Sequence, residues 1–150
     1  MPQHVPVIRE LGPADTAAAY EAMAELRRLD SRESFVDRVA TERREGYRLI
    51  ASFEEGDDQA AAVMGFRVAH FLAWGKTLYI DDVSTRTRYR GRGHAGSLMD
   101  WLLTEARRLE CDQLHLDSGV GADRETAHRL YMNKGLRISA HHFQIDLRKR

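Results

Sequence analysis

The sequence predicts an α+β fold built on a mixed, mostly antiparallel sheet that is flanked by helices. In the first half, apolar and polar residues alternate in runs separated by turn residues, which is typical of antiparallel strands. From His94 the apolar residues recur every three or four positions, as in an amphipathic helix. A strand, a helix and a strand follow, which adds one parallel crossover. The predicted order is β-α-α-β-β-β-α-β-α-β, within a single domain over residues 1–150.

In the first half we expect four strands and two helices. Gly12 and Pro13 end the first strand, and Ser31 or Ser34 can cap the second helix. The turn 55–58 connects two strands into a hairpin. The expected elements are a strand over Val5–Glu10, a helix from Pro13 to Leu29, a helix carrying Phe35 and Val39, and strands over residues 47–53, 60–73 and 76–83.

In the second half we expect two helices and two short strands. The first helix runs from His94 to Leu109, and a strand follows over Gln113–Asp117. Asp123 can cap the next helix, and Gly135 suits its C′ position. Phe143, Ile145 and Leu147 alternate with polar residues and predict a final strand.

The composition argues against several classes of function. Equal numbers of basic and acidic residues, 23 of each, argue against affinity for nucleic acid through a basic field. Cys111 is the only cysteine, which excludes an intramolecular disulfide and a cysteine metal cluster. The segment 1–6 lacks an apolar signal core, and no apolar run approaches the ~20 residues that span a bilayer. We expect a cytoplasmic protein with no membrane partner and no metal.

The stretch RYRGRGHAGSL, residues 88–98, predicts a site for a phosphate-bearing cofactor. It precedes a helix, whose first N–H groups lack intrahelical partners and carry partial positive charge. Glycines there let a phosphate approach the backbone closely. Arg88, Arg90 and Arg92 add positive charge. The alternative interpretation is a solvated basic turn that begins a helix.

The string Gly91–Gly96 also satisfies G-x-G-x-x-G, the fingerprint of dinucleotide binding. That fold places the glycines directly after a parallel strand, early in a βαβαβ unit. Here the polar residues 84–90 intervene, and only one crossover is available. Asp117 stands at the end of the next strand, where a ribose-binding acid would lie. A nucleotide (NAD)-dependent oxidoreductase therefore stays an alternative.

Two motifs resemble a known family. Arg88-x-x-Gly91-x-Gly93 fits Q/R-x-x-G-x-G/A, the pattern of the GNAT superfamily of acyl-CoA-dependent N-acetyltransferases. The block Ala127–Leu136 resembles the A-x-x-L/F-Y-x-x-x-G-F block of that family, and Tyr79–Thr85 is similar to its fourth strand. The resemblance extends from about Tyr47 to Leu147, and the two preceding helices match the family order.

The resemblance implies how acetyl-CoA would bind. In this family the fourth and fifth strands splay apart, and the pantetheine arm lies in the gap. The backbone of Val83, Ser84 and Thr85 would pair with that arm. The N–H groups of the loop would hold the pyrophosphate, with Arg88, Arg90 and Arg92 contributing charge. The residues concerned are Gly91, Arg92, Gly93, His94, Ala95 and Gly96, with Ala95 where the family often has glycine.

The resemblance also implies a reaction, the direct attack of a primary amine on the thioester in a ternary complex. An alkyl amine with a pKa of about 10.4 is mostly protonated at neutral pH and must lose a proton. Asp81 is the candidate base, with Asp82 next, and adjacent strand residues face opposite sides. Tyr131 is the candidate acid for the leaving thiolate, and a backbone N–H near Val83 could stabilise the oxyanion. The alternatives are an arginine-paired Asp81 and a merely packed Tyr131.

The acceptor class stays open at this point. A small-molecule amine and a protein amino group both fit, and the resemblance is consistent with a homodimer. The family often has asparagine seven residues before the tyrosine, where this chain has Arg124. A non-catalytic module that binds acyl-CoA is a third possibility.

Overall fold

The computed structural model describes residues 5–148. Residues 1–4 and 149–150 lie outside the described part, and residues 1–4 belong to the segment that lacks an apolar signal core. The chain divides into two compact units, 1–116 and 117–150, and each is described by itself. The single domain over residues 1–150 therefore stays a prediction. Strands in the described part are β1 (Val7–Leu11), β2 (Arg48–Phe53), β3 (Ala62–Phe71), β4 (Gly75–Thr85) and β5 (Gln113–Leu116).

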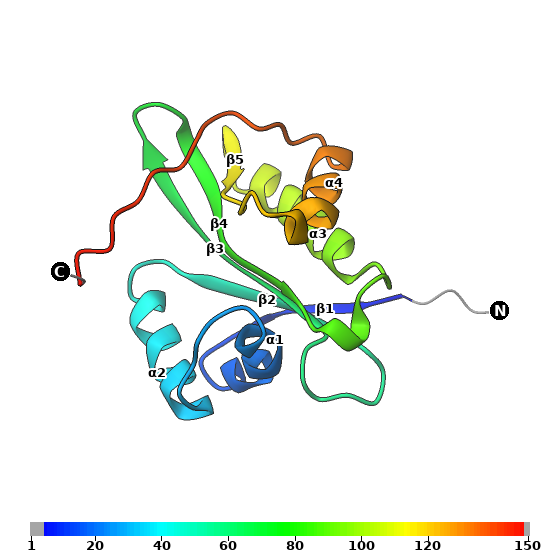
Figure 1. Ribbon diagram of the computed structural model, residues 1–150. Coiled ribbons are helices and arrows are strands. Elements are labelled where there is room, and N and C mark those ends of the chain that lie inside the picture. Colours follow the sequence, from blue (N-terminus) through cyan, green and yellow to red (C-terminus); the bar gives the residue numbers. More distant parts are fainter. Residues whose placement is uncertain (1–4, 149–150) are drawn as a thin grey trace. The chain divides into compact units, whose positions relative to one another are not determined.

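The first unit is built on one five-stranded sheet, whose spatial order β1-β2-β3-β4-β5 follows the chain (Figure 1). The first four strands pair antiparallel, and β5 pairs parallel to β4. The parallel pair needs a crossover, which α3 (His94–Arg108) supplies. The predicted α+β class and mixed sheet are confirmed.

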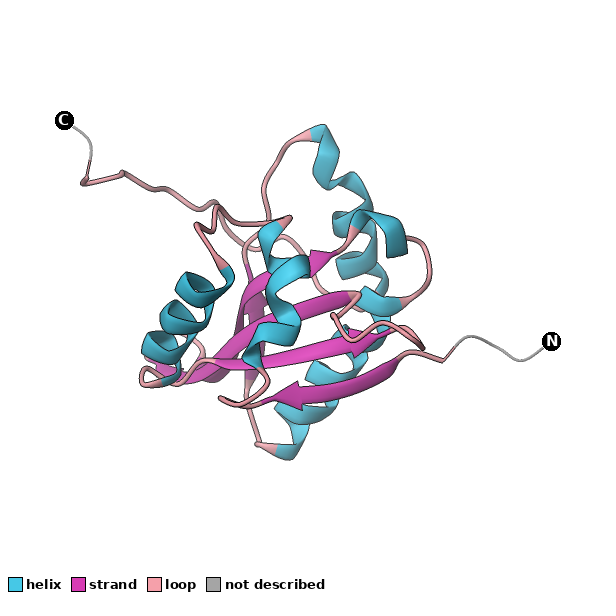
Figure 2. Cartoon of the chain, turned by 90° about the horizontal axis from the view of Figure 1, so that it is seen from below, coloured by secondary structure: helices cyan, strands magenta, loops and turns pink. Residues whose placement is uncertain are grey.

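Helices lie on both faces of this sheet. A 3₁₀ turn, η1 (Thr16–Ala19), leads into α1 (Tyr20–Ala24), which lies with α2 (Arg32–Arg43) on one face (Figure 2). The helix α3 lies on the opposite face (Figure 1). Between β4 and α3 comes a second 3₁₀ turn, η2 (Thr87–Tyr89). The glycine loop therefore follows β4 and begins the helix that crosses over to β5.

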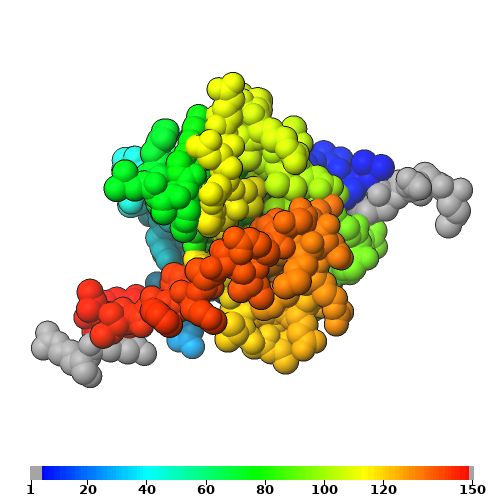
Figure 3. Space-filling model, turned by 90° about the horizontal axis from the view of Figure 1, so that it is seen from above, coloured from blue at the N-terminus to red at the C-terminus, as the bar shows by residue number. Residues whose placement is uncertain are grey.

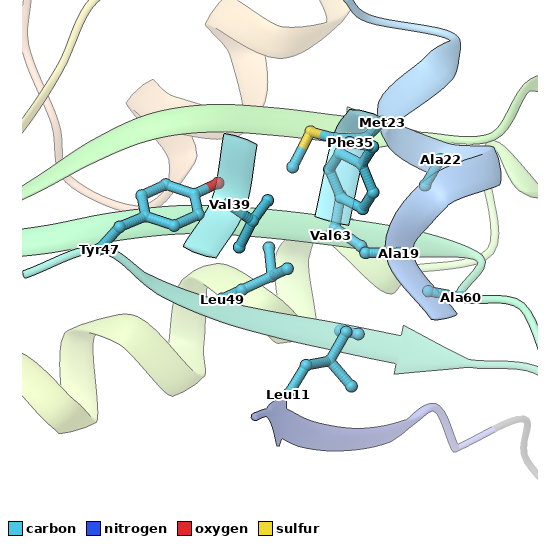
Figure 4. Close-up of a cluster of buried hydrophobic side chains, with 11 residues drawn as sticks. Leu11, Ala19, Ala22, Met23, Phe35, Val39, Tyr47, Leu49, Ala60 and Val63 are labelled. Carbon is cyan, nitrogen blue, oxygen red and sulfur yellow. The ribbon is translucent and has the colours of Figure 1, made fainter. Parts of the chain in front are cut away.

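The core on the α1/α2 side is formed by small, aliphatic and aromatic side chains (Figure 4). Phe35 and Val39 lie one turn apart on α2 and are 3% exposed. They face Leu49 of β2 and Val63 of β3, which are fully buried (Figure 4). The Ser31 side chain caps α2 by accepting a hydrogen bond from Ser34 N at 3.0 Å, as predicted.

The first helix is shorter than predicted, and at its N-terminal side the side chain of Gln59 provides the reason. In a continuous α-helix Glu21 N would donate to Ala17 O. Instead, Glu21 N donates to Gln59 Oε1 at 3.0 Å, and Gln59 Nε2 donates to Ala17 O at 3.0 Å. A side chain inserted into the backbone ladder interrupts the helix. Leu26 and Leu29, expected on that helix, lie in the segment after α1.

Glu105 ties α3 to the sheet through two arginines. Its carboxylate accepts from Arg108 at 2.6 and 2.8 Å and lies 2.7 Å from Arg48 Nη2 on β2. Arg48 is also paired with Glu10 of β1. The hydrogen bonds from Arg108, together with Arg48, hold the pKa of Glu105 at about 2, although burial opposes this. In the folded protein, Glu105 therefore stays charged at pH values well below those at which an ordinary carboxyl group takes up a proton.

We expect Glu105→Gln to lower the free energy of unfolding at pH 7 by about 1.5–3 kcal/mol, the range for hydrogen bonds to charged groups. The pKa is lower in the folded state, so the contribution is complete above pH 4.5 and is lost as pH falls toward 2. Denaturant unfolding from pH 7 to pH 3 measures this. Glu33→Gln is the matched control, because the Glu33 side chain is exposed on α2. A difference between E105Q and wild type that is constant with pH would contradict the prediction.

The second unit contains η3 (Ala122–Arg124) and α4 (Glu125–Asn133). Arg124, not Asp123, occupies the N-cap of α4, so the predicted cap is wrong; a 3₁₀ turn takes up Asp123. Gly135 follows the helix with φ +93°, as predicted for C′. The predicted strand over Phe143–Leu147 is also wrong. The segment 137–146 has no regular structure (Figure 3) and no described strand pairs with it, and Phe143 is 91% exposed.

Candidate functional site

The pairing between the strands β4 and β5 ends halfway along β4. Their parallel pairing runs from Thr77 with Gln113 to Ile80 with Leu116. β4 then continues to Thr85, still paired with β3 on its other side. Within the first unit, the β5-facing edge of residues 81–85 has no strand partner. Val83, Ser84 and Thr85 lie on this open edge, which is where the pantetheine arm was expected. The Ser84 hydroxyl donates to Ala22 O at 2.6 Å, so its side chain is held by α1.

A β-bulge lies at the point of divergence. Gly65 of β3 pairs with Asp82, and the next residue, Phe66, pairs with Ile80, so Asp81 has no residue opposite. Bulges kink a strand and redirect its side chains. As a result, Asp81 and Asp82 both line one cavity. The expectation that adjacent residues of this strand face opposite sides is therefore wrong here.

The cavity holds about 280 Å³ and lies between β4 and the helices α1 and α2. One part of its lining is apolar: Met23, Leu29, Phe35 and Val39. The other part is polar and mostly charged: Arg27, Arg38, Glu42, Tyr47, Asp81 and Asp82. A small organic molecule with an apolar body and a charged end suits this lining.

Asp82 is fully engaged by hydrogen bonds. Arg27 donates to its Oδ1 from Nε at 3.0 Å and from Nη2 at 2.9 Å. The Tyr47 hydroxyl donates to its Oδ2 at 2.8 Å. Burial and the nearby Asp82 charge raise the pKa of Tyr47, which therefore stays protonated as a donor. With both oxygens occupied, Asp82 is poorly placed to receive a further proton.

Asp81 differs in having one oxygen available. Arg67 donates to its Oδ2 from Nε at 2.9 Å and from Nη2 at 2.5 Å, and no described residue donates to its Oδ1. Arg67 Nη2 also reaches Glu42 Oε1 at 3.0 Å. Burial raises the pKa of Asp81, against the opposing charge of Arg67. Burial likewise raises the pKa of Glu42, with Asp82 adding repulsion. The site therefore contains carboxylates whose affinity for a proton is increased.

Gly65 makes room for Tyr47 beside the bulge. A Cβ at this position would overlap the Tyr47 hydroxyl and the adjoining ring atoms. We expect Gly65→Ala to displace the phenol from Asp82 and to lower the free energy of unfolding by about 1–3 kcal/mol, as overpacking does. A double-mutant cycle checks this by denaturant unfolding: in a Tyr47→Ala background the same substitution should cost much less. Equal costs in the two backgrounds would contradict the steric explanation.

Two glycines of the glycine loop have a left-handed backbone conformation. Gly91 has φ +77°, and Gly93, the N-cap of α3, has φ +86°. Both values lie in the left-handed region that favours glycine. A Cβ on either residue would meet no atom within 4 Å, so the space beside the loop is open. The first intrahelical N–H partner is Ser97, which donates to Gly93 O. The earlier N–H groups are directed out of the helix end.

The arginines of the loop have different surroundings. Arg92 donates to Glu54 at 2.6 and 3.2 Å, so its charge is already paired. Arg88 lies over the Tyr89 ring, 4.9 Å from the centroid, and Arg90 reaches Thr85 O at 3.4 Å. Within residues 5–148, no carboxylate forms a salt bridge with Arg88 or Arg90. These two side chains are the ones available to a phosphate.

The His94 side chain is buried beneath the loop and points toward Ser52 and Glu54. Its Nδ1 lies 2.6 Å from Ser52 Oγ, and its Nε2 lies 2.8 Å from Glu54 Oε1. A ring that donates from Nε2 and accepts at Nδ1 satisfies both contacts. His94 therefore anchors the start of α3 to β2 and to the loop after it. Only its backbone N–H is available to the phosphate, and the same holds for Ala95 and Gly96, which have no polar side chain.

In the second unit, Tyr131 lies on α4 and is 9% exposed. Burial raises its pKa, so the phenol keeps its proton at neutral pH. Arg124 is exposed beside Asp123, at 3.9 Å. His142 lies 3.2 Å from Asp117.

No group of three or more metal-ligating side chains occurs among the described residues. No helix in the described part is long and apolar enough to cross a bilayer.

Comparison with known proteins identifies the family. Residues 16–136 match the acetyltransferase (GNAT) family. This match covers the cavity, the open edge of β4, the glycine loop and Tyr131. The chain belongs to the GNAT acetyltransferase family. The expected acyltransferase class is thereby confirmed, and neither the dinucleotide oxidoreductase nor the non-catalytic module is supported.

Solved structures of GNAT-type acetyltransferases share the fold at low sequence identity. Glucosamine-6-phosphate N-acetyltransferase from Arabidopsis thaliana is 20% identical, with a TM-score of 0.77 over 96% of this chain and 99% of that one. Ribosomal-protein-alanine N-acetyltransferase from Brucella melitensis biovar Abortus 2308 is 17% identical, with a TM-score of 0.78 over 95% and 99%. A predicted acetyltransferase with acetyl-CoA from Clostridium acetobutylicum is 15% identical, with a TM-score of 0.72 over 95% and 97%. A comparison with curated sequences finds no significant match.

Several residues that surround Asp81 were not singled out from the sequence. They are Arg27, Glu42, Tyr47 and Arg67. Two signals were available. Arg67 interrupts an apolar run in a predicted strand, and Gly65 lies inside the same strand, which suggests a bulge or a close approach. Glu42 carried no such signal, because a charged residue on a helix is usually solvated.

Proposed function

We propose that the protein transfers an acetyl group from acetyl-CoA to a primary amine by direct attack in a ternary complex. The observation that carries this proposal is the position of Asp81. It stands at the bulge where β4 leaves β5, it lines the cavity, and its Oδ1 accepts no hydrogen bond from a described residue. The acceptor is a small-molecule amine or a protein amino group.

The fit of acetyl-CoA to the first unit rests on three features. The open edge of β4 offers backbone groups of Val83, Ser84 and Thr85 to an amide-bearing arm. The open space at Gly91 and Gly93 admits a pyrophosphate onto the N–H groups from Gly91 to Gly96. Arg88 and Arg90 supply positive charge nearby. Acetyl-CoA contributes the activated thioester, and all other roles fall to residues of the chain.

The roles of the residues follow from their protonation states. Asp81 Oδ1 takes a proton from the ammonium of the acceptor, directly or through water, and its raised pKa helps it to do so. The amine nitrogen forms a bond to the acetyl carbonyl carbon, and the carbon–sulfur bond breaks. A backbone N–H near Val83 stabilises the negative charge that develops on the carbonyl oxygen. Tyr131 gives its phenolic proton to the departing thiolate. The nitrogen loses its second proton as the amide forms, and that proton restores the phenol of Tyr131 directly or through water.

Ligand-dependent unfolding tests the cofactor part of the proposal. Acetyl-CoA or free CoA at a hundred times its Kd should stabilise the protein by about 2.7 kcal/mol. For a chain of this size, each 1 kcal/mol raises the Tm by about 2–4 °C. NAD at the same concentration should give no shift. A shift with NAD alone would overturn the proposal. Release of CoA in the presence of a panel of primary amines then tests the transfer itself.

Replacing Tyr131 with phenylalanine should lower kcat by about 10²-fold, the lower end of the range for a positioned acid. The substitution removes only the phenolic proton donor, so Tm should change little. Acetyl-CoA affinity measured by calorimetry should also be retained. Because burial raises the pKa of Tyr131, wild-type kcat should not fall between pH 7 and 9 through loss of this proton. Unchanged turnover in Y131F would remove the residue from the mechanism.

A further inference from the structure

The acceptor cavity has a charge arrangement that points to a particular class of amine. Three carboxylates belong to it: Glu42, Asp81 and Asp82. Three guanidiniums accompany them. Arg27 is bound to Asp82, Arg67 is bound to Asp81 and Glu42, and Arg38 lines the same cavity. The charges of these six groups are balanced before any acceptor enters.

Arg38 differs from the other two arginines because it has no carboxylate partner in the described part of the chain. Its one hydrogen bond is a long one, 3.4 Å to Arg28 O. The side chain is exposed on α2, at the edge of the cavity. A guanidinium in this state keeps most of its five donors for an outside group, and its planar fork suits carboxylate or phosphate oxygens.

The helix α2 sets the spacing between the guanidinium of Arg38 and the carboxylate of Glu42. Arg38 and Glu42 are four residues apart, so their Cβ atoms lie about 5–6 Å from each other on one helix face. Phe35 and Val39 repeat the same spacing beside them and are apolar. Met23 and Leu29 extend the apolar wall. Arg38 therefore places a site for an anion next to the site for a cation at Glu42 and Asp81, and the apolar surface lies beside both.

We propose that the acceptor is a small zwitterion, an amino-acid-like molecule with one ammonium group, one anionic oxygen group and an apolar side group. This inference rests on the proposed transfer to an amine. The ammonium lies at Asp81 and Glu42, the anion lies at Arg38, and the apolar group packs on Phe35, Val39, Met23 and Leu29. A zwitterion keeps the site neutral, whereas a polyamine would place unpaired positive charge against three arginines. The cavity of about 280 Å³ suits a metabolite of this size.

Matched acceptors test the proposal. Phenylalanine and phenethylamine differ only in the carboxylate, the phosphonate analogue of phenylalanine changes the anion, and spermidine is a polycation. Their affinities are measured by calorimetry with free CoA present, and their kcat/KM values with acetyl-CoA. We expect phenylalanine or its phosphonate to exceed phenethylamine by about tenfold or more, the scale of one charge-assisted pair. The tighter of the two anionic compounds identifies the anion.

The variant Arg38→Gln separates the anion site from the rest of the cavity. The ratio of kcat/KM for the preferred anionic compound, phenylalanine or its phosphonate, to that for phenethylamine should fall to near one. Arg44→Gln is the control, because Arg44 stands at the C-cap of α2 and does not line the cavity, so the ratio should be kept. The inference would be overturned if neither anionic compound binds more tightly than phenethylamine, if spermidine binds more tightly than both, if no acceptor binds, or if the ratio is unchanged in R38Q.

The same samples distinguish this inference from the function on which it rests. Stabilisation by acetyl-CoA and turnover of phenethylamine without a preference for either anionic compound would support the transferase and overturn only the acceptor class. Absence of stabilisation by acetyl-CoA would overturn both.

Discussion

Asp81→Asn is expected to lower kcat/KM by about 10²- to 10⁴-fold, the range for a positioned general base. The amide keeps the size of the side chain but cannot take a proton from the acceptor. Asp82→Asn is the matched variant one residue along the bulge, where both oxygens already accept hydrogen bonds. We expect a smaller loss there, since Asp82 holds Arg27 and Tyr47 in place and does not receive the proton.

The pH profile gives Asp81→Asn a readout that misfolding would not mimic. In wild type, kcat/KM should fall on the acid side as Asp81 takes up a proton. Because burial raises the pKa of this carboxyl, the fall should occur at a higher pH than for an ordinary aspartate. The acid limb should disappear in D81N and persist in D82N. An acid limb that survives in D81N would transfer the role of base to Glu42, whose pKa is also raised.

Replacing Gly93 is expected to have the second large effect, on the binding of acetyl-CoA. Gly93→Glu should raise the Kd by about 100-fold or more. An L residue resists φ +86°, at a cost of about 1–2 kcal/mol, and the added carboxylate repels a pyrophosphate at the start of α3. Calorimetric titration with acetyl-CoA measures the loss.

Gly46 provides a matched control for backbone strain. It follows α2 with φ +94°, and a Cβ there would also meet nothing within 4 Å. Gly46→Glu should lower the free energy of unfolding by a similar amount to Gly93→Glu while leaving the Kd for acetyl-CoA unchanged. Equal losses of affinity in the two variants would show that strain, and not the position of Gly93, is responsible.

The strand β4 has two different roles along its length. Up to Ile80, β4 is an interior strand of the sheet; beyond the bulge it has an open edge and two carboxylates on one cavity. Gly65 permits Tyr47 to lie over the bulge, and Tyr47 in turn holds Asp82. The packing of a phenol on a glycine thus positions one carboxylate and leaves its neighbour available.

Local patterns by themselves predicted the five strands of the sheet, most helices and the glycine loop, because period, caps and left-handed glycines act over a few residues. The resemblance to the GNAT family added Asp81, Tyr131 and the backbone of Val83 as site candidates. Other features depended on contacts between distant residues, and only the tertiary structure decided them. Gln59 shortened the first helix from 38 residues away along the chain, and the bulge opposite Gly65 brought Asp81 and Asp82 to one cavity.

The final predicted strand shows the same distinction. The alternation of Phe143, Ile145 and Leu147 specifies which residues share a face, but a strand forms only where a neighbour accepts and donates its backbone hydrogen bonds. No described strand does so here. Arg67 and Glu42 reached the site in a comparable way, since a charge from β3 and a charge from α2 meet only after the sheet and helix have packed. Periodicity encodes faces, whereas pairing and convergence are properties of the folded chain.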